Sequence, residues 1–342
     1  MHIGFIIDDW NNINPVRNTT LRLVHEAFLR DYFVGILYPN NLTIRNNVVH
    51  GFFKVLEKMD KIPSNTETFF KKASFKEQML PLKGFDAIFV RKDPPIDSTM
   101  LNFLDSVAND VLILNDINGM RKANNKTYTT VFNDPQNTFL PITFVSKNKE
   151  YLKRVISESK HEKMILKPLK GYGGKGVIVL EKNAIHNINS LLDFYIDGPD
   201  EKNYVIVQEY IEGAEHGDTR VLLLNGQVLG ALKRVPAEDD VRSNMHAGGS
   251  AQKHLLTPEE KAICKKIGPQ LVQDGLYFVG IDIINGKLLE VNVLSPGALV
   301  AINRLYKTKL QKKVIDFIEE KVNEKEDAIK QRIAYREAVK NA

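Results

Sequence analysis

The sequence has little cysteine, since Cys264 is the only one among 342 residues. A single cysteine excludes an intramolecular disulfide and a zinc site built from cysteines. It fits a reducing compartment, and we expect a cytoplasmic protein. Because Cys264 lies in a helical pattern over residues 261–267, we interpret it as a structural helix residue rather than as a nucleophile.

The sequence also lacks long apolar runs. No run approaches the roughly 18–20 residues of a membrane-spanning helix, so we expect no membrane span. The first eight residues hold a short apolar run without a basic leader, which predicts a buried strand rather than a signal peptide. Charge is nearly balanced, with 47 Lys and Arg against 42 Asp and Glu. We therefore predict no nucleic-acid partner, and the net charge of +5 leaves that class as a weak alternative.

The composition is that of an ordinary globular protein, with 43% hydrophobic and 26% charged residues. These values exclude a disordered, collagen-like or coiled-coil chain. A length of 342 residues predicts two or three domains of roughly 100–200 residues each.

The first part of the chain alternates short apolar strands with helical segments. We expect strands at 3–7, 34–38, 85–91 and 111–114, and an amphipathic helix at 19–30. This alternation is typical of a parallel sheet with crossover helices. Ligands gather at the carboxyl ends of such strands, where Asp8, Asp9 and the 91–95 run follow.

After about residue 160 the pattern changes to short strands joined by turn signals. We expect strands at 164–168, 177–180, 205–209, 220–224, 228–234 and 288–293, and helices at 150–158 and 258–274. Two Asn-Gly pairs, at 225–226 and 285–286, favour antiparallel hairpins. From about residue 312 the chain is rich in Lys and Glu and has a helical pattern with an apolar stripe at Val314, Ile318 and Val322, which is weak over the last twenty or so residues. We expect a solvated helix, with a partner-binding or oligomer helix as the alternative.

Glycines are concentrated at residues 171–176, Gly-Tyr-Gly-Gly-Lys-Gly. A strand follows this loop, so it is not a Rossmann fingerprint, and Val177 stands where a Walker A loop has its Lys. A glycine loop between two strands can cover phosphates with its backbone N–H groups, and the alternative is a plain hairpin turn. Lys126 and Lys167 are lysines of the kind that bind polyphosphates, although either alone is more often a surface cation.

The strand at 205–209 ends at a turn over residues 208–211. Such a turn could present backbone groups and a carboxylate to adenine and ribose. Asp218 and Arg220 would then add a second carboxylate and a fixed cation.

Three oxygen-bearing side chains, Asp282, Glu290 and Asn292, lie in two apolar strands. Residues 290 and 292 share a face, and oxygen ligands of this type suit Mg²⁺. A plain two-residue turn at 285–286 would place Asp282 opposite Leu289. A shared site therefore requires a three-residue or bulged turn, with Gly286 in the left-handed conformation. The alternative is a structural salt bridge between the strands.

Together, these residues resemble the ATP-grasp superfamily and, within it, the bacterial-type glutathione synthetases. The stretches that carry the resemblance are Val90–Asp97, Ile165–Gly174, Gly217–Val221, Lys233–Pro236, Ala247–Gly249, Ile267–Pro269, Gly275–Ile284 and Leu289–Val293. They follow the family's order. The Arg-Lys-Asp-Pro-Pro run from Arg91 and the Phe-Val-Gly-Ile-Asp-Ile-Ile run from Phe278 are the specific ones.

The resemblance implies an α/β N-terminal domain followed by α+β ATP-grasp lid and catalytic domains. The substrate-binding N-terminal domain would span residues 1–120, the lid 121–204 and the catalytic domain 205–318. The charged helical tail at 319–342 has no counterpart in the family. A polar stretch at 236–250 is a candidate for a closing loop.

The resemblance also implies the roles of single residues. ATP would be held by Lys126, Lys167, Gly171, Tyr172, Gly173, Gly174, Gln208, Glu209, Tyr210, Ile211 and Asp218. Two Mg²⁺ ions, or Mn²⁺, would be held by Asp282, Glu290 and Asn292. Arg220 and Arg234 would be catalytic and would face the transferring phosphoryl group and the acyl intermediate. Arg91, Asn14 and Ser295 would contact the peptide or amine substrate.

The implied reaction joins γ-glutamylcysteine and glycine through an acyl phosphate, in a homo-oligomer that acts on small molecules. Two stretches depart from the family pattern. Leu294–Gly297 replaces a Thr-Ser-Pro-Thr-like run, and residues 237–240, with His246 beyond them, are acidic where the family is glycine-rich. The alternatives are a related ligase with another γ-glutamyl or dipeptide donor or another amine, and a non-catalytic ATP-binding module.

Overall fold

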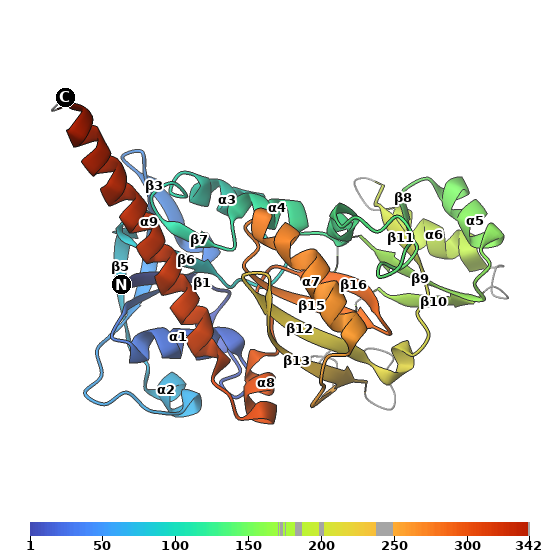
Figure 1. Ribbon diagram of the computed structural model, residues 1–342, viewed down its shortest axis with the longest axis horizontal. Helices are drawn as coiled ribbons and strands as arrows, with labels where there is room; N and C mark the ends of the chain where they lie inside the picture. The colour runs from blue at the N-terminus through green and yellow to red at the C-terminus, as the bar shows by residue number, and fades with distance from the viewer. Residues whose placement is uncertain are drawn as a thin grey trace. The chain divides into compact units, whose positions relative to one another are not determined.

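The computed structural model describes residues 1–169, 171, 174, 176–181, 187–197, 202–236 and 249–340. The chain forms two compact units (Figure 1). The first comprises Met1–Arg121, Asp274–Phe278 and Val293–Ala342, and the second comprises Lys122–Gln273 and Val279–Asn292. The chain therefore leaves the first unit twice and returns to it twice.

The first unit is built on a seven-stranded sheet ordered β3-β4-β2-β1-β6-β7, with β5 beside β4. Its strands are β1 (His2–Ile6), β2 (Phe33–Leu37), β3 (Leu42–Arg45), β4 (Val48–Leu56), β5 (Phe75–Pro81), β6 (Ala87–Val90) and β7 (Leu112–Leu114). The pairs β1–β2, β1–β6 and β6–β7 are parallel, as the alternation of strands and helices predicts.

The sheet is mixed, and the prediction of a purely parallel sheet is wrong at one edge. There β3, β4 and β5 form an antiparallel meander that the sequence analysis does not include. The β3–β4 turn consists of Asn46 and Asn47, with φ of 51° and 62°. Asparagine tolerates this left-handed conformation better than most residues, so the Asn-Asn pair is a hairpin signal that the sequence did offer.

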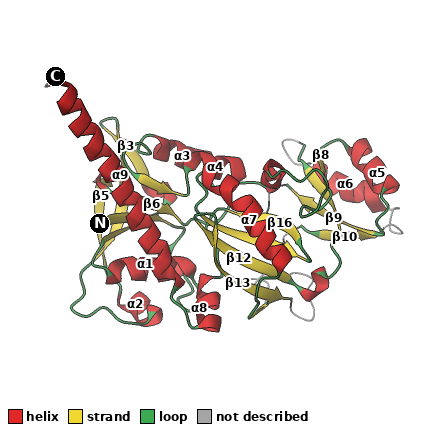
Figure 2. Cartoon of the chain, viewed as in Figure 1, coloured by secondary structure: helices red, strands yellow, loops and turns green. Residues whose placement is uncertain are grey.

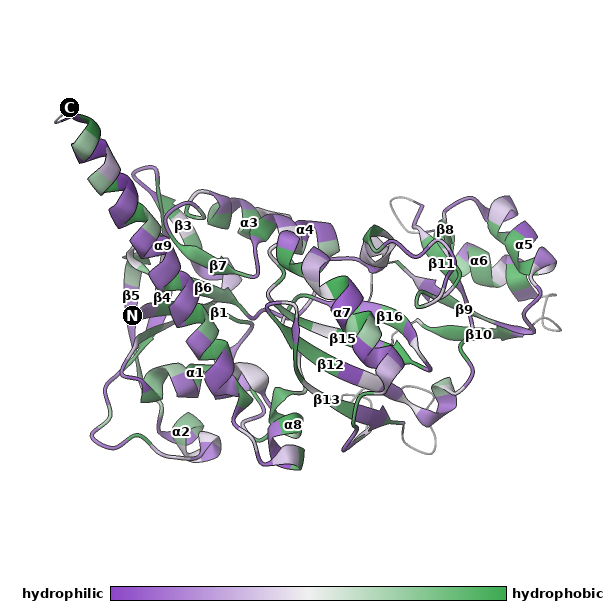
Figure 3. Cartoon of the chain, in the orientation of Figure 1, coloured by the Kyte–Doolittle hydropathy of each residue, from purple (hydrophilic) through white to green (hydrophobic). Residues whose placement is uncertain are grey.

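The helices of the first unit are α1 (Thr19–Leu29), α2 (Thr66–Lys72), α3 (Ser98–Asp105), α8 (Leu299–Tyr306) and α9 (Leu310–Lys340), and α4 (Ile117–Ala123) leads into the second unit. The side chain of Asn18 caps α1 by accepting from the Leu21 N–H, and the buried face of α1 contacts α9. The predicted apolar stripe of α9 is buried at 314, 318 and 322, whereas residues 326–340 are all exposed. Figure 3 shows hydrophilic and hydrophobic residues mixed along this helix.

The second unit contains two sheets (Figure 2). The smaller sheet has the order β10-β9-β11-β8 and is antiparallel throughout. Its strands are β8 (Thr143–Ser146), β9 (Lys163–Pro168), β10 (Ile178–Glu181) and β11 (Val205–Glu209). Helices α5 (Lys149–Glu158) and α6 (Ile188–Ile196) share its core, in which Leu152, Leu166 and Leu192 are fully buried.

The larger sheet has the order β14-β13-β12-β15-β16. Its strands are β12 (Asp218–Leu224), β13 (Gln227–Val235), β14 (Ser250–Gln252), β15 (Phe278–Ile284) and β16 (Lys287–Asn292), and α7 (Pro258–Gln273) contacts β13. Both predicted Asn-Gly turns are two-residue hairpin loops, because Leu224 pairs with Gln227 and Ile284 with Lys287. Among the described residues, no helix is both long and apolar enough to cross a membrane.

Candidate active site

Two lysines of the second unit share a charged environment with Glu290. Lys167, on β9, is 8% exposed, and its Nζ donates to Oε1 of Gln208 at 2.8 Å. Burial lowers the pKa of Lys167 to about 8. The negative charge of Glu290 raises this pKa, and the positive charge of Lys126 lowers it further. Lys126 is the first residue of the short helix η4 (Lys126–Val131), and its Nζ donates to the Gly171 carbonyl at 2.6 Å. Burial lowers the pKa of Lys126 as well. The structure thus brings together the two lysines that the sequence singled out.

The predicted glycine loop lies between β9 and β10. Gly174 and Gly176 have φ of 71° and 69°, which an L-residue with a Cβ adopts only with strain. The Tyr195 hydroxyl donates to the Gly176 carbonyl at 2.8 Å. Gly171 is exposed, and Tyr172 and Gly173 lie outside the described residues. The described part of the loop therefore has the backbone conformation for which glycine is needed.

The hairpin of β15 and β16 contains the bulge that the sequence analysis requires. Gly286 is left-handed, with φ of 72°, but the loop itself has only two residues. The register shifts one step further on, where Ile283 pairs with Leu288 and Asp282 pairs with Glu290. The bulged residue is Leu289, and it moves Glu290 onto the face of Asp282. The bulge lies in the strand and not in the turn.

Asp282 is buried and is surrounded by protein donors. Its Oδ1 accepts from Arg220 Nε and lies 3.0 Å from an Arg234 nitrogen, while its Oδ2 accepts from Arg220 and Asn292 at 2.9 and 3.2 Å. Burial alone would raise the pKa of Asp282, but Arg220 and Arg234 lower it to about 2. Because a carboxylate has about four acceptor positions, these donors occupy the full capacity of Asp282.

The two arginines are themselves held in place from β12 and β13. Arg234 pairs with Asp218 across the strands and donates to both of its carboxylate oxygens. Burial would lower the pKa of Arg234, but Asp282 and Asp218 raise it above its ordinary value. Arg220 follows Asp218 by two residues, so both side chains lie on one face of β12. Asp218 therefore orients a cation here.

Glu290 differs from Asp282 because its carboxylate has neither a hydrogen bond nor an ion pair with any described residue. Burial and the charge of Asp282 raise its pKa, while Lys126, Lys167 and Arg220 lower it. No group of three or more His, Cys, Asp or Glu side chains among the described residues could hold a metal ion. The oxygen donors available are the Glu290 carboxylate and the amide oxygen of Asn292. This donor set fits a hard cation such as Mg²⁺ that keeps water or phosphate oxygens as its remaining ligands.

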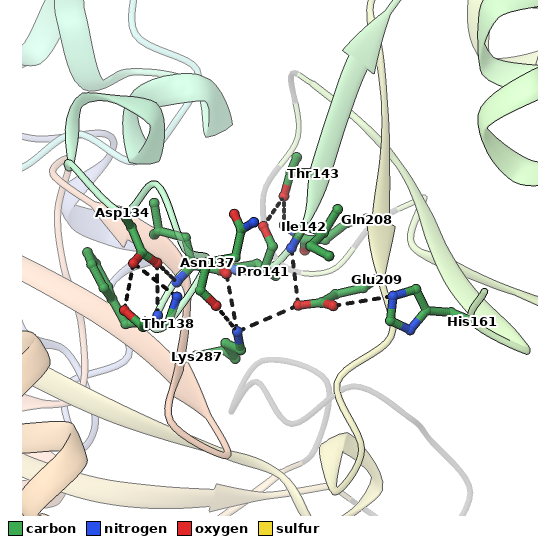
Figure 4. Close-up of polar contacts among 12 residues, drawn as sticks. Asp134, Asn137, Thr138, Pro141, Ile142, Thr143, His161, Gln208, Glu209 and Lys287 are labelled. Atoms are coloured by element: carbon green, nitrogen blue, oxygen red, sulfur yellow. Dashed lines mark hydrogen bonds and ion pairs between the residues drawn. The ribbon is translucent and has the colours of Figure 1, made fainter. Parts of the chain in front are cut away.

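The predicted nucleotide-binding turn at 208–211 begins with Gln208, the hydrogen-bond partner of Lys167 on β11. The Glu209 carboxylate accepts from the Ile142 N–H at 3.1 Å and lies 3.9 Å from Lys287 Nζ and 3.6 Å from His161 Nε2 (Figure 4). The Tyr210 hydroxyl donates to Glu215 at 3.0 Å. The carbonyl of Ile211 accepts from the Ala214 N–H at 3.2 Å.

Figure 4 also shows three residues of this polar network that are not among the predicted site residues, namely Lys287, Asp134 and His161. Lys287 is the first residue of a strand and follows a turn, where a lysine is unremarkable. No local pattern marks such a residue, because its partners come from other strands and loops.

The predicted substrate residues lie in the first unit. Arg91 is 3% exposed; its Nε donates to the Thr20 hydroxyl at 3.1 Å and an Nη donates to the Pro296 carbonyl at 3.2 Å. The other Nη is buried and has no hydrogen-bond partner among the described residues, although the guanidinium lies over the rings of Phe89 and Phe278. Burial lowers the pKa of Arg91 to about 10. Arg91 is thus brought to the 294–297 run that departs from the family pattern.

Ser295 and Asn14 also lie in this unit. Ser295 has φ of 41°, and Ala298, just after the 294–297 run, has φ of 82°, so the backbone is strained on both sides of Pro296. Asn14 is exposed, and its side chain accepts from the Val16 N–H at 3.0 Å in a turn before α1.

Two further expectations concern Cys264 and the closing-loop candidate at 236–250. Cys264 is 2% exposed in α7, and burial raises the pKa of its thiol to about 12, which confirms that it is structural. Of the closing-loop candidate at 236–250, residues 237–248 lie outside the described residues, and so does His246.

Two sequence profiles of known families match this chain. The profile described as "Prokaryotic glutathione synthetase, N-terminal domain" matches residues 1–121, and "Prokaryotic glutathione synthetase, ATP-grasp domain" matches residues 125–307. The chain is 35% identical to the glutathione synthetase of Bradyrhizobium diazoefficiens, over 94% of this chain and 98% of that protein. It is 33% identical to that of a Nostoc species, over 93% and 98%.

Solved structures share the fold at low sequence identity. A D-cycloserine synthetase matches with a TM-score of 0.62 and 13% identity, over 93% of this chain and 100% of that one. A RiPP-associated ATP-grasp ligase of Chryseobacterium gregarium matches with a TM-score of 0.63 and 14% identity, over 94% and 97%. At these identities the likeness concerns the fold alone.

Proposed function

Because this chain belongs to the prokaryotic glutathione synthetase family, we propose that it joins γ-glutamylcysteine to glycine at the expense of ATP. The observation that carries this proposal is the match of the two family profiles over residues 1–121 and 125–307, together with relatives that the chain covers almost completely. The same relatives do not favour another donor, another amine or a non-catalytic module. The chain is an ADP-forming carbon–nitrogen ligase of the ATP-grasp fold.

The reaction has two steps. A carboxylate oxygen of the dipeptide attacks the γ-phosphorus of ATP and forms an acyl phosphate while ADP leaves. The glycine nitrogen then attacks the acyl carbon, loses a proton, and inorganic phosphate leaves as the amide bond of glutathione forms. Such chemistry requires positioned reactants and charge neutralisation more than a protein nucleophile.

The proposed nucleotide site uses the second unit. Lys126 and Lys167 would contact phosphate oxygens, and the glycine loop over 171–174 would cover them with backbone N–H groups. The turn at 208–211 would hold the adenine and ribose. Arg220 and Arg234 would face the phosphoryl group in transfer, and Asp218 and Asp282 already hold them in place.

The family uses ATP, and Mg²⁺ is generally needed; two ions, or Mn²⁺ in their place, belong to the proposal. When bound, the metal would neutralise phosphate charge. Glu290 and Asn292 would hold it with the oxygens described above. Asp282 can join them only if one of its four protein donors gives way.

The proposed peptide site uses the first unit. The buried Nη of Arg91 that lacks a hydrogen bond to any described residue supports a role in binding a carboxylate of the dipeptide, since such a group loses its water without gaining a hydrogen bond. Asn14 and Ser295 would complete this site.

We further propose the domain division at residues 120, 204 and 318, a cytoplasmic location and a homo-oligomeric state. Size-exclusion chromatography with light scattering tests the oligomeric state.

The decisive experiment is phosphate release from ATP in the presence of Mg²⁺, γ-glutamylcysteine and a panel of small amines. Release that requires the dipeptide and glycine, with glutathione identified by mass, is the expected result. Release with the dipeptide and a different amine would reassign the acceptor and point to the 294–297 run. No release with any amine, in a protein that binds ATP, would overturn the proposal.

A further inference from the structure

Three segments of the second unit meet at Lys287, the first residue of β16. Its Nζ donates to the Asn137 carbonyl and, at 3.4 Å, to the Leu140 carbonyl. The next residue, Leu288, donates its N–H to the Phe139 carbonyl at 2.7 Å. The start of β16 is therefore bound through a side chain and through the backbone to the segment that leads into β8. Figure 4 shows the side-chain contacts of Lys287.

That segment has a fixed shape of its own. Asp134, whose side chain is 2% exposed, accepts from the N–H groups of Thr138, Phe139 and Leu140 at 3.0, 2.8 and 2.7 Å. Burial would raise the pKa of Asp134, but these hydrogen bonds and that of the Thr138 hydroxyl lower it to about 2. The carbonyls that Lys287 contacts thus belong to a rigid turn.

The third segment is the end of β11. Glu209 and Ile142 bond reciprocally, because the Glu209 N–H donates to the Ile142 carbonyl at 3.0 Å and the Glu209 carboxylate accepts from the Ile142 N–H at 3.1 Å. The same carboxylate lies 3.9 Å from Lys287 Nζ. The side chains are 10% and 23% exposed, so the pair is better shielded from water than a surface ion pair.

Both residues of this ion pair lie close in sequence to residues of the proposed active site. Glu209 follows Gln208, which binds Lys167, and Lys287 precedes Glu290 by three residues on the strand that carries it. We propose that Lys287 and Glu209 are a positioning pair, which holds β16 against the end of β11 and so fixes the distance between Glu290 and Lys167. The inference rests on the proposed function, in which these two groups hold the metal and the phosphates. Misplacement by about 1 Å can cost on the order of 100-fold in rate.

The test compares Lys287→Met, which keeps the length of the side chain and removes its charge, with Lys287→Arg and Glu209→Gln. We expect Lys287→Met to lower kcat at least 10-fold and to raise the Mg²⁺ concentration for half-maximal rate, with the KM for the dipeptide changed less than 2-fold. Lys287→Arg should recover at least half of kcat. The losses of kcat in Lys287→Met and Glu209→Gln should be less than additive in the double variant, because the two changes share one interaction. The matched control is Lys265→Met on the exposed face of α7, which should behave as wild type.

A readout without turnover separates this inference from the proposed function. We expect Mn²⁺ titrated against the ADP-bound protein, followed by electron paramagnetic resonance, to bind at least 5-fold more weakly to Lys287→Met than to wild type. If wild type makes no glutathione, the proposed function fails while this comparison still tests the pair. A folded Lys287→Met with wild-type kcat and wild-type Mn²⁺ affinity would overturn the inference. So would a Lys287→Arg protein as slow as Lys287→Met.

Discussion

Asp282 and Glu290 are opposite each other in one hairpin and have contrasting partners. The Asp282 carboxylate is saturated by Arg220, Arg234 and Asn292, whereas the Glu290 carboxylate has no hydrogen bond or ion pair among the described residues. A buried carboxylate with four donors is a fixed anchor for those donors. A carboxylate beside lysines that bonds to neither of them is free to take a cation.

Glu290→Gln tests this difference. The substitution keeps the size of the side chain and removes its charge, so we expect kcat to fall by roughly 100-fold or more, in the range of losses seen when one group that stabilises transition-state charge is removed. Circular dichroism and the melting temperature should stay near wild type. Glu259→Gln, at an exposed position of α7, is the control. Near-normal turnover of Glu290→Gln would remove it from the metal site.

Lys167 predicts a pH dependence of nucleotide binding. Its pKa is about 8 in the folded protein and near 10.5 in an unfolded chain, so the unfolded chain binds more protons between these values and this lysine makes stability rise with pH across that window. ATP favours the charged form. We therefore expect the KM for ATP to increase as the pH rises through about 8.

Lys167→Arg is the matched variant for this pH dependence, because an arginine stays charged over the whole range. The KM for ATP of Lys167→Arg should be flatter between pH 7 and 9.5 than that of wild type. Parallel curves for the two proteins would show that another group is responsible.

Among the elements, the β12–β13 pair depends on a close backbone approach at Gly217. A Cβ on Gly217 would lie 1.8 Å from the Arg234 carbonyl oxygen, and its φ is 90°. By contrast, a Cβ on Gly286 would meet nothing within 4 Å, and only its φ of 72° is unfavourable. A substitution of Gly217 therefore adds a steric collision to the backbone strain, whereas a substitution of Gly286 causes backbone strain alone.

We expect Gly286→Ala to lower the free energy of unfolding by about 1 kcal/mol, the usual cost of a side chain in this conformation. Gly217→Ala should cost roughly 2–4 kcal/mol and should also reduce activity, because it displaces the strand that carries Arg234. Urea denaturation and turnover measured on both variants check this order. Equal losses would mean that the strand shifts without cost.

Over the whole molecule, one residue, Asn115, binds the chain at two of the four points where it enters or leaves the first unit. Asn115, 3% exposed, donates to the carbonyls of Phe278 and Val293 at 2.9 Å each and accepts from the Phe278 N–H at 2.8 Å. These positions flank the hairpin that carries Asp282 and Glu290. A single amide in the first unit thus secures both ends of that hairpin.

The C-terminal helix divides into a packed part and an exposed part. Ile318 is fully buried, so Ile318→Ala should cost about 2–5 kcal/mol. Truncation after Lys325 removes only residues that are exposed where the structure describes them, and we expect the melting temperature and kcat to stay near wild type. Light scattering of the truncated protein checks its association state. A loss of subunits would identify the helix end as an oligomer contact.

Local patterns in the chain were sufficient for much of the fold. Strand alternation, Asn-Gly turns and the apolar stripe of α9 depend on neighbouring residues, and the structure confirms them. The family resemblance rests on short motifs in a fixed order, and the comparisons confirm it. The antiparallel edge of the first sheet is not among the predictions, although its Asn46–Asn47 turn is a local hairpin signal.

The partners of the charged site residues depend on contacts between distant segments, which no local pattern contains. Arg220 and Asp282 are 62 residues apart, and Lys167 and Gln208 are 41 apart, so their pairing depends on strand order and register. A bulge at Leu289 places Glu290 on the face of Asp282, and a shift of one residue would have reversed that face. The residue types that suit ATP chemistry can thus be read along the chain, while the partner and protonation of each charge follow from folding, because burial and opposing charges arise only between distant segments.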